Sequence, residues 1–193
     1  STVATNALLE EEGAKTGLIT TDGFQDIIAI GREKREDTYD LSPSKIPTFT
    51  HRQDRIGISE RMSADGEVLE ELSEQDIKQA VEQFEQSGTE SIAVSFLHSY
   101  QNGSHEHQSK NIIMENSDFH VSTSSEVLNE IKEYERTLAT VIDAYVNPLV
   151  GEYLTSLEDH LASLDIDAEL YLMQCNGGVM TTDHLSGRSV RLI

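Results

Sequence analysis

The sequence has few of the residue types that commonly mark a redox, disulfide or membrane protein. Its 193 residues include one cysteine, Cys175, three prolines and no tryptophan. A single cysteine excludes an internal disulfide and a thiolate metal cluster, so we expect Cys175 to be a small buried hydrophobic residue. No apolar stretch approaches the ~20 residues needed to cross a bilayer. We expect a cytoplasmic protein without membrane contact, and the missing initiator Met predicts a piece of a longer chain.

Basic residues are also scarce. There are 14 Lys and Arg residues against 35 Asp and Glu residues, which gives a net charge of −21 spread along the whole length. Self-repulsion of this size destabilises a compact state at low ionic strength, and salt relieves it. The composition predicts a halophilic acidic protein, with an ordinary acidic protein as the alternative. Nucleic acid is disfavoured as a partner in either case.

The hydrophobic pattern alternates between helical and strand periods, which is typical of an α/β fold. Ser73, three residues before Asp76, is a capping-box signal, and Gly88 follows the last apolar residue of that helical pattern. The segment after Gly31 contains Pro43 and Pro47 and ends in an expected edge strand. We expect helices at residues 3–12, 22–28, 73–88 and 104–115, and strands at residues 16–20, 55–61, 92–97 and 119–123.

Beyond Ser125 the helical period continues for about forty residues. Asn147 and Pro148 interrupt it, because Asn is a good N-cap and Pro is favoured in the first turn of a helix. We therefore expect a long pair of helices on either side of residue 147. A strand at residues 169–173 and a turn at Asn176, Gly177 and Gly178 should follow.

Polar side chains gather at the end of the apolar run at residues 91–97. His98 follows it directly, and His105 and Glu106 come seven and eight residues later. The carboxyl ends of parallel strands are where α/β proteins place their sites. His98, His105 and Glu106 could coordinate a divalent metal ion, or they could form structural hydrogen bonds at the strand end.

Two other groups are candidates for a nucleotide or substrate cleft. Thr2, Thr5 and Asn6 lie at the start of a helix and could donate to phosphate oxygens, or serve as ordinary caps. Asn176, Gly177 and Gly178 could line the cleft, or form a plain tight turn. Tyr134, Glu135 and Arg136 are expected to form an internal ion pair on their helix.

Several short motifs occur in an order that resembles one enzyme family. The order is similar to that of the hydantoinase A/5-oxoprolinase family, which also contains the β subunits of acetone carboxylases. The motifs cover essentially the whole chain, at residues 2–9, 13–24, 30–32, 60–61, 96–100, 105–106, 125–127, 134–136, 144–148 and 173–178.

The resemblance implies a fold related to actin, Hsp70 and sugar kinases, in which two α/β lobes enclose a nucleotide. Residues 1–122 would be an α/β region of the hydantoinase/oxoprolinase N-terminal type, truncated at its start. Residues 123–193 would begin the hydantoinase A catalytic region, truncated at its end. The expected fold class is thus an α/β fragment of this ATPase fold with a long helical pair.

The resemblance also implies an activity. Family members open cyclic amides such as hydantoin, N-methylhydantoin or 5-oxoproline, using ATP to activate the amide oxygen because an amide is a poor electrophile. The full-length parent would use ATP and Mg²⁺, with a second divalent metal left open, and a hydantoinase B-type partner subunit or domain. The alternatives are a fragment of an acetone-carboxylase-type β subunit and an interaction module without catalysis.

Some features depart from the family pattern. The glycine-rich phosphate motifs of the family would precede Ser1 and follow Ile193, so we expect this chain alone not to bind ATP tightly. Asp143 stands where many relatives have Asn, and Cys175 stands where Ser is common. We also expect His98, His105 and the turn at residues 176–178 to lie at neighbouring strand ends of one sheet.

Overall fold

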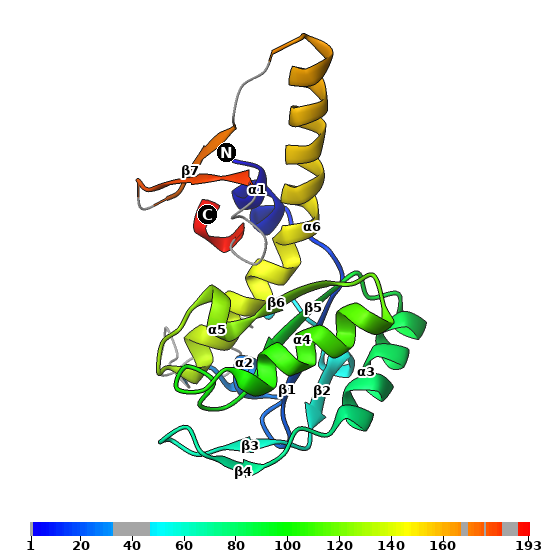
Figure 1. Ribbon diagram of the computed structural model, residues 1–193, viewed down its shortest axis with the longest axis vertical. Coiled ribbons are helices and arrows are strands. Elements are labelled where there is room, and N and C mark those ends of the chain that lie inside the picture. Colours follow the sequence, from blue (N-terminus) through cyan, green and yellow to red (C-terminus); the bar gives the residue numbers. More distant parts are fainter. Residues whose placement is uncertain (1, 33–46, 167–169, 176, 183–188) are drawn as a thin grey trace, which may run out of the picture.

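The centre of the protein is a parallel four-stranded sheet with the strand order β2-β1-β5-β6. The computed structural model describes residues 2–32, 47–166, 170–175, 177–182 and 189–193 (Figure 1). The strands are β1 (Thr16–Thr21), β2 (Arg55–Ile58), β5 (Ser91–Ser95) and β6 (His120–Thr123). Every residue of β1 and β5 is buried. This agrees with a sheet covered on both faces, and β2 is the edge strand that the sequence predicts.

Helices cover both faces of this sheet. One face carries α3 (Glu74–Ser87) and α4 (Ser104–Asn116), and the other carries α2 (Ile27–Ile30) and the first half of α6 (Glu133–Ser163). Figure 1 shows α3 and α4 in front of the strands.

Helix α3 follows its sequence signals closely. The Ser73 hydroxyl accepts a hydrogen bond from the Asp76 N–H at 3.3 Å, and Gly88 ends the helix in the left-handed conformation, with φ of 70°. Its apolar face packs on the sheet, where the Phe84 ring lies directly over Gly17 of β1. A Cβ atom at Gly17 would lie 2.6 Å from that ring, so the packing needs glycine there.

Helix α6 corrects the prediction of a helical pair. It is one helix of 31 residues with Pro148 inside it, and Figure 1 shows that its axis bends in the middle. A proline removes one backbone hydrogen bond and normally breaks a helix. Here Val141 and Ala144 before it pack on the sheet, while Val150 and Leu154 after it pack in a second cluster. Packing of both halves keeps the helix continuous.

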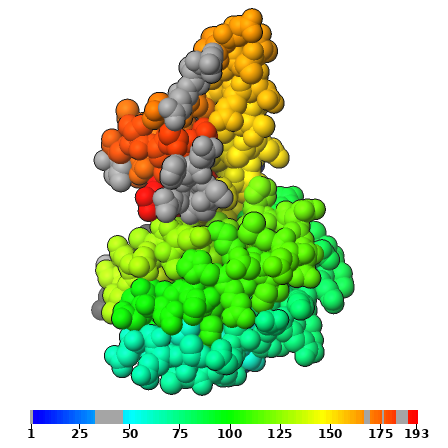
Figure 2. All heavy atoms as spheres, viewed as in Figure 1, coloured from blue at the N-terminus to red at the C-terminus, as the bar shows by residue number. Residues whose placement is uncertain are grey.

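The second cluster lies beyond the amino ends of the strands. It contains α1 (Val3–Leu9), the second half of α6, the antiparallel strands β7 (Tyr171–Met173) and β8 (Val179–Thr181), and η3 (Ser189–Leu192). Figure 2 shows this group above the layer formed by the sheet and its helices. Because α1 packs with the second half of the chain, the division between residues 122 and 123 does not separate the two clusters and stays a prediction.

The remaining elements are short. They are η1 (Arg52–Asp54), α5 (Ser124–Val127) and the antiparallel pair β3 (Arg61–Met62) and β4 (Val68–Glu70). Three local expectations were wrong: α1 ends at Leu9 instead of residue 12, α2 begins at Ile27 instead of residue 22, and Cys175 is exposed. None of the helices in the described ranges has both the length and the apolar character needed to span a bilayer.

Candidate functional site

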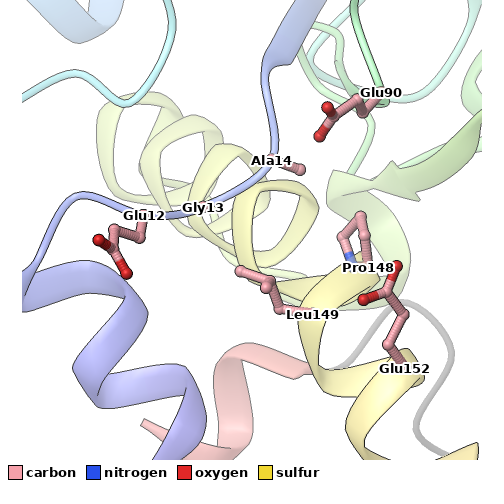
Figure 3. A pocket seen from close by; sticks show the side chains of 7 residues that line it. All are labelled: Glu12, Gly13, Ala14, Glu90, Pro148, Leu149 and Glu152. Carbon is pink, nitrogen blue, oxygen red and sulfur yellow. The ribbon is translucent and has the colours of Figure 1, made fainter.

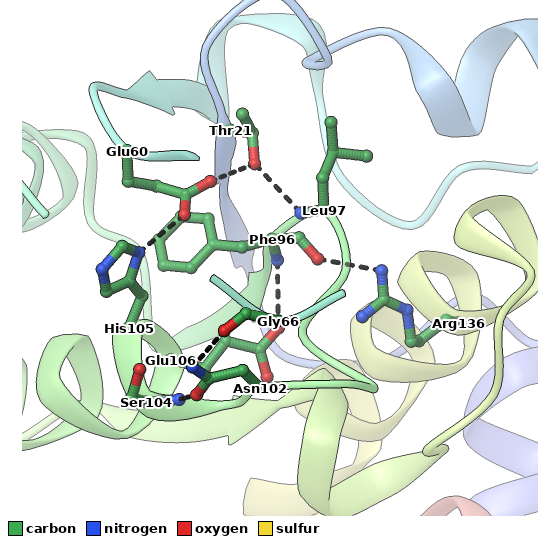
Figure 4. Close-up of polar contacts among 10 residues, drawn as sticks. All are labelled: Thr21, Glu60, Gly66, Phe96, Leu97, Asn102, Ser104, His105, Glu106 and Arg136. Atoms are coloured by element: carbon green, nitrogen blue, oxygen red, sulfur yellow. Dashed lines mark hydrogen bonds and ion pairs between the residues drawn. The ribbon is translucent and has the colours of Figure 1, made fainter. Parts of the chain in front are cut away.

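The carboxyl edge of the sheet carries a buried polar network. Because β1, β5 and β6 are parallel and adjacent, Thr21, Ser95 and Thr123 at their ends lie along the same edge. Side chains from β1, α4 and α6 and from the segment between β2 and β3 converge there (Figure 4), and the start of α5 contacts Glu106 of α4. Residues far apart in the sequence therefore meet where ligands of α/β proteins commonly bind.

Three side chains hold the backbone where β5 ends. The Phe96 N–H donates to Glu106 Oε1 at 3.0 Å, and the Phe96 carbonyl accepts from Arg136 Nη2 at 2.8 Å. The next N–H, that of Leu97, donates to Thr21 Oγ1 at 3.0 Å. The exit of the strand is thus fixed from both sides by groups that are themselves buried.

Glu106 and Arg136 also connect the neighbouring segments. Glu106 accepts from Ser124 Oγ at 2.5 Å and from the Ser125 N–H at 2.8 Å, and Arg136 donates to Ser124 Oγ at 3.2 Å and to Ser99. Burial lowers the pKa of the Arg136 guanidinium from its usual value, and the Glu106 carboxylate opposes this effect. Removing either partner would leave a buried charge uncompensated.

Glu60 and His105 form a second buried pair in this network. His105 Nδ1 lies 2.8 Å from Glu60 Oε2, and Thr21 donates its hydroxyl to the other Glu60 oxygen. Both side chains are almost fully enclosed. The geometry at His105 and Glu106 is that of structural hydrogen bonding. No group of three His, Cys, Asp or Glu residues in the described ranges is arranged to hold a metal ion.

His98 lies next to the network and differs from its members in backbone conformation. Its backbone φ is +58°, in the left-handed region, and its Nδ1 is enclosed without a hydrogen-bond partner. The residue as a whole is only half-buried, and its ring lies 6.1 Å from that of Tyr100. Non-glycine residues in this conformation are uncommon and often occur at functional sites.

The other candidate residues lie elsewhere. Thr2 precedes α1 without a side-chain cap, and Thr5 and Asn6 lie on that helix. Gly177 and Gly178 form the tight turn between β7 and β8: the Gly177 N–H donates to the Gln174 carbonyl at 3.0 Å, and Gly177 has φ of 83°. Asn176 lies outside the described residues.

The expectation that the histidines and this turn share one sheet was wrong. β7 and β8 form a separate two-stranded sheet in the second cluster, next to α1. That cluster is near the amino end of β1, whereas His98 and His105 lie beyond the carboxyl end of β5. The chain order explains the separation, because α1 leads directly into β1 and the network follows the last residues of the strands.

A hollow of about 200 Å³ lies between the two clusters (Figure 3). It is lined by Glu12, Gly13, Ala14, Glu90, Pro148, Leu149 and Glu152. Three of these side chains are carboxylates, so a polyphosphate would be repelled instead of held. The hollow does not fit the phosphates of ATP, and we assign no step of nucleotide chemistry to it.

The sequence pattern indicated some members of the network but not others. His105 and Glu106 were candidates, but Thr21, Glu60 and Ser124 were not. Glu60 and Arg136 belong to motifs of the family pattern, which was the available signal. The expected ion pair within residues 134–136 was wrong: Glu135 pairs with Arg32, while Arg136 belongs to the network.

A separate buried carboxylate joins the two halves of the chain. Asp143 on α6 accepts from Ser122 Oγ at 2.8 Å and from the Val190 N–H at 2.7 Å. It is fully enclosed, and this burial raises its pKa to about 6, even though the hydrogen bonds and the charge of Arg191 act in the opposite direction.

Comparison with known families identifies the chain. The model described as the hydantoinase/oxoprolinase N-terminal region matches residues 1–117, and a second model, described as hydantoinase/oxoprolinase, matches residues 136–193. The chain therefore belongs to the hydantoinase/oxoprolinase family. Residues 118–135 lie between the two matched ranges, and the second range begins within α6, the helix that both clusters share.

Individual relatives are much longer than this chain. It is 32% identical over its whole length to the caprolactamase subunit alpha of Pseudomonas jessenii and covers 28% of that protein. It is 32% identical to 5-oxoprolinase of Saccharomyces cerevisiae (97% of this chain, 16% of that protein) and 30% identical to the acetophenone carboxylase gamma subunit of Aromatoleum aromaticum (92% and 26%). The crystal structure of the ATP-dependent caprolactamase from Pseudomonas jessenii superposes with a TM-score of 0.86 at 33% identity, over 93% of this chain and 26% of that one.

Proposed function

We propose that this chain is part of a larger ATP-dependent enzyme that opens the ring of a cyclic amide. The observation that carries the proposal is the similarity to the ATP-dependent caprolactamase, which extends over 93% of the chain at a TM-score of 0.86. The chain spans about a quarter of that protein. Family membership supports an enzymatic parent, and the similarity to 5-oxoprolinase supports a second cyclic amide as substrate class.

Within such an enzyme, the described residues would contribute a rigid backbone segment at the carboxyl edge of the sheet. Glu106, Arg136 and Thr21 hold the backbone at the end of β5 from both sides. Preorganised groups of this kind lower the cost of binding a substrate in its reactive geometry. The parent would use ATP with Mg²⁺, and the proposal places no phosphate group in the hollow near Glu90, because that hollow is lined by carboxylates.

The parent protein would work with a partner subunit. Two relatives are themselves subunits, one named alpha and the other gamma. We propose a hydantoinase B-type subunit or domain as the partner. The acetophenone carboxylase relative supports a second candidate function, the ATP-driven carboxylation of a ketone.

The test uses the complete parent protein purified together with its partner. Ring opening of 5-oxoproline, hydantoin, N-methylhydantoin and caprolactam is followed with and without ATP and Mg²⁺, and phosphate release is measured in the same samples. We expect product and phosphate to appear together only when ATP is present. Equal ring opening without ATP contradicts the proposal. Bicarbonate-dependent consumption of acetone or acetophenone supports the carboxylase instead, and inactivity in every assay supports an interaction module.

A further inference from the structure

The two histidines of the motif after β5 have opposite environments. His105 is enclosed and its Nδ1 is paired with Glu60, while its Nε2, like Nδ1 of His98, is enclosed without a hydrogen-bond partner among the described residues. His98 is half-buried, and its Nδ1 has no hydrogen-bond partner among the described residues. Of the two, His98 is therefore the imidazole that remains available to a ligand at this edge of the sheet.

The structure holds His98 in a conformation that it would rarely adopt by itself. Its φ of +58° is uncommon for a residue with a side chain and persists only where the surroundings enforce it. Those surroundings are the side chains that form hydrogen bonds with the backbone of Phe96 and Leu97. Glu106 and Arg136 hold the Phe96 peptide, and Thr21 holds the Leu97 N–H (Figure 4).

The loop after His98 is also held by hydrogen bonds. The Gln101 N–H donates to the His98 carbonyl at 2.9 Å, and Asn102 Nδ2 donates to the Gly66 carbonyl of the β3–β4 turn at 2.9 Å. The Arg136 guanidinium lies 5.6 Å from the centre of the Tyr100 ring, and this ring meets that of His98 edge-on. The backbone of His98 is thus held by hydrogen bonds, and its ring contacts that of Tyr100 without taking part in the network's hydrogen bonds.

The chemistry of the ligand follows from the ring and its surroundings. A neutral imidazole carries one N–H, and a proton on Nε2 avoids a buried N–H without an acceptor at Nδ1. The network that holds Phe96 and Leu97, the two residues before His98, contains the carboxyl groups of Glu60 and Glu106 and the guanidinium of Arg136. In a chain with a net charge of −21, this environment disfavours a polyphosphate. A neutral carbonyl oxygen is not repelled and can accept a hydrogen bond from Nε2.

We propose that His98 donates a hydrogen bond from Nε2 to the carbonyl oxygen of the substrate, and that Glu106, Arg136 and Thr21 are positioning residues for it. The inference rests on the proposed function for the existence of a carbonyl substrate. Cyclic amides and ketones share this oxygen, so the inference applies to ring opening and to carboxylation alike.

The first experiment measures contact without relying on turnover. The complete protein with its partner is treated with diethyl pyrocarbonate, and modification of each histidine is followed by peptide mass spectrometry. The ligands are caprolactam, 5-oxoproline, hydantoin and acetophenone, each first shown to bind or not to bind by calorimetry. At tenfold excess over the dissociation constant, a bound ligand should slow modification of His98 by roughly tenfold. The exposed His120, at the opposite end of the sheet, should react at an unchanged rate.

The ligand that protects His98 separates this inference from the proposed function. Protection by a cyclic amide agrees with both. Protection by acetophenone alone contradicts ring opening and supports the role of His98. If a calorimetrically bound ligand leaves His98 fully reactive, or if Mg·ATP alone protects it, the inference is overturned.

The second experiment tests the role in catalysis. His98→Asn keeps a residue type that tolerates the left-handed conformation but removes the imidazole. We expect kcat/KM to fall by at least about tenfold, with most of the loss in kcat and little change in melting temperature, because the hydrogen bond strengthens as charge develops on the oxygen. The control His120→Asn should behave like wild type. A His98→Asn enzyme within about twofold of wild type contradicts the proposal.

The positioning residues are tested by coupling. Glu106→Gln should lower kcat/KM in the wild-type background and have no further effect in the His98→Asn background. Thr21→Val, which removes the acceptor for the Leu97 N–H, provides the same test if Glu106→Gln does not fold. If the losses in kcat/KM of the two single variants simply add in the double variant, the network acts on stability alone and the positioning role is contradicted.

Discussion

Replacing Asp143 by Asn should stabilise the folded chain near neutral pH. Asp143 is fully enclosed on α6, and burial raises the pKa of its carboxyl group to about 6 from a usual value of 3.8. The shift of about two pH units corresponds to about 3 kcal/mol, at about 1.4 kcal/mol per unit. This energy is the cost of keeping an ionised carboxylate in a site that favours the neutral form.

The sign follows from the direction of the shift. Between about pH 4 and pH 6 the folded state binds more protons at Asp143 than the unfolded state does, so this residue makes the free energy of unfolding fall as pH rises. The decrease is complete above about pH 6. Asn has nearly the same shape and can still accept from the Val190 N–H, while its amide N–H can donate to a rotated Ser122 hydroxyl. We expect a gain of about 1–3 kcal/mol at pH 7.5.

Urea unfolding of the 193-residue chain at several pH values between 4 and 8 measures this gain. The difference in free energy of unfolding between Asp143→Asn and wild type should be small near pH 4 and grow up to about pH 6. Asp159→Asn, an exposed substitution on the same helix, serves as the control for net charge. If Asp143→Asn is less stable than wild type at pH 7.5, the ionised carboxylate contributes more through its hydrogen bonds than burial costs, and the reasoning is wrong.

Three further predictions concern charge, nucleotide and packing. The melting temperature should rise steeply between dilute buffer and molar KCl, because salt screens the net charge of −21, and a flat response would remove the argument for a halophilic protein. Isothermal titration of this chain with Mg·ATP in molar KCl should show no tight binding, and a micromolar dissociation constant would contradict the charge argument at the hollow near Glu90. Gly17→Ala should lower the free energy of unfolding by about 1–3 kcal/mol, measured by urea unfolding, because the new Cβ would lie 2.6 Å from the Phe84 ring. The control Gly151→Ala has open space around its Cβ and should not lower the free energy of unfolding.

The sequence by itself determined the elements whose signals are local. Helix α3 begins after Ser73 and ends before Gly88 as expected, because both caps act within one turn of the backbone. The buried strands were recognisable from short apolar runs, and the family from the order of motifs along the chain. In the candidate site, His98, His105 and Glu106 could be named because they lie within about ten residues of the end of one of these strands.

Only the tertiary structure decided how distant segments combine. Pro148 predicts a break by local rules, but contacts with two different clusters keep α6 continuous. Glu60 meets His105 across 45 positions, and Thr21 meets the Leu97 backbone across 76. The contact between Thr21 and Leu97 exists because the parallel register of β1 and β5 brings the ends of these strands together, and no local pattern encodes that register. The contact between Glu60 and His105 joins the segment after β2 to α4, and it forms only when both elements pack beside the sheet.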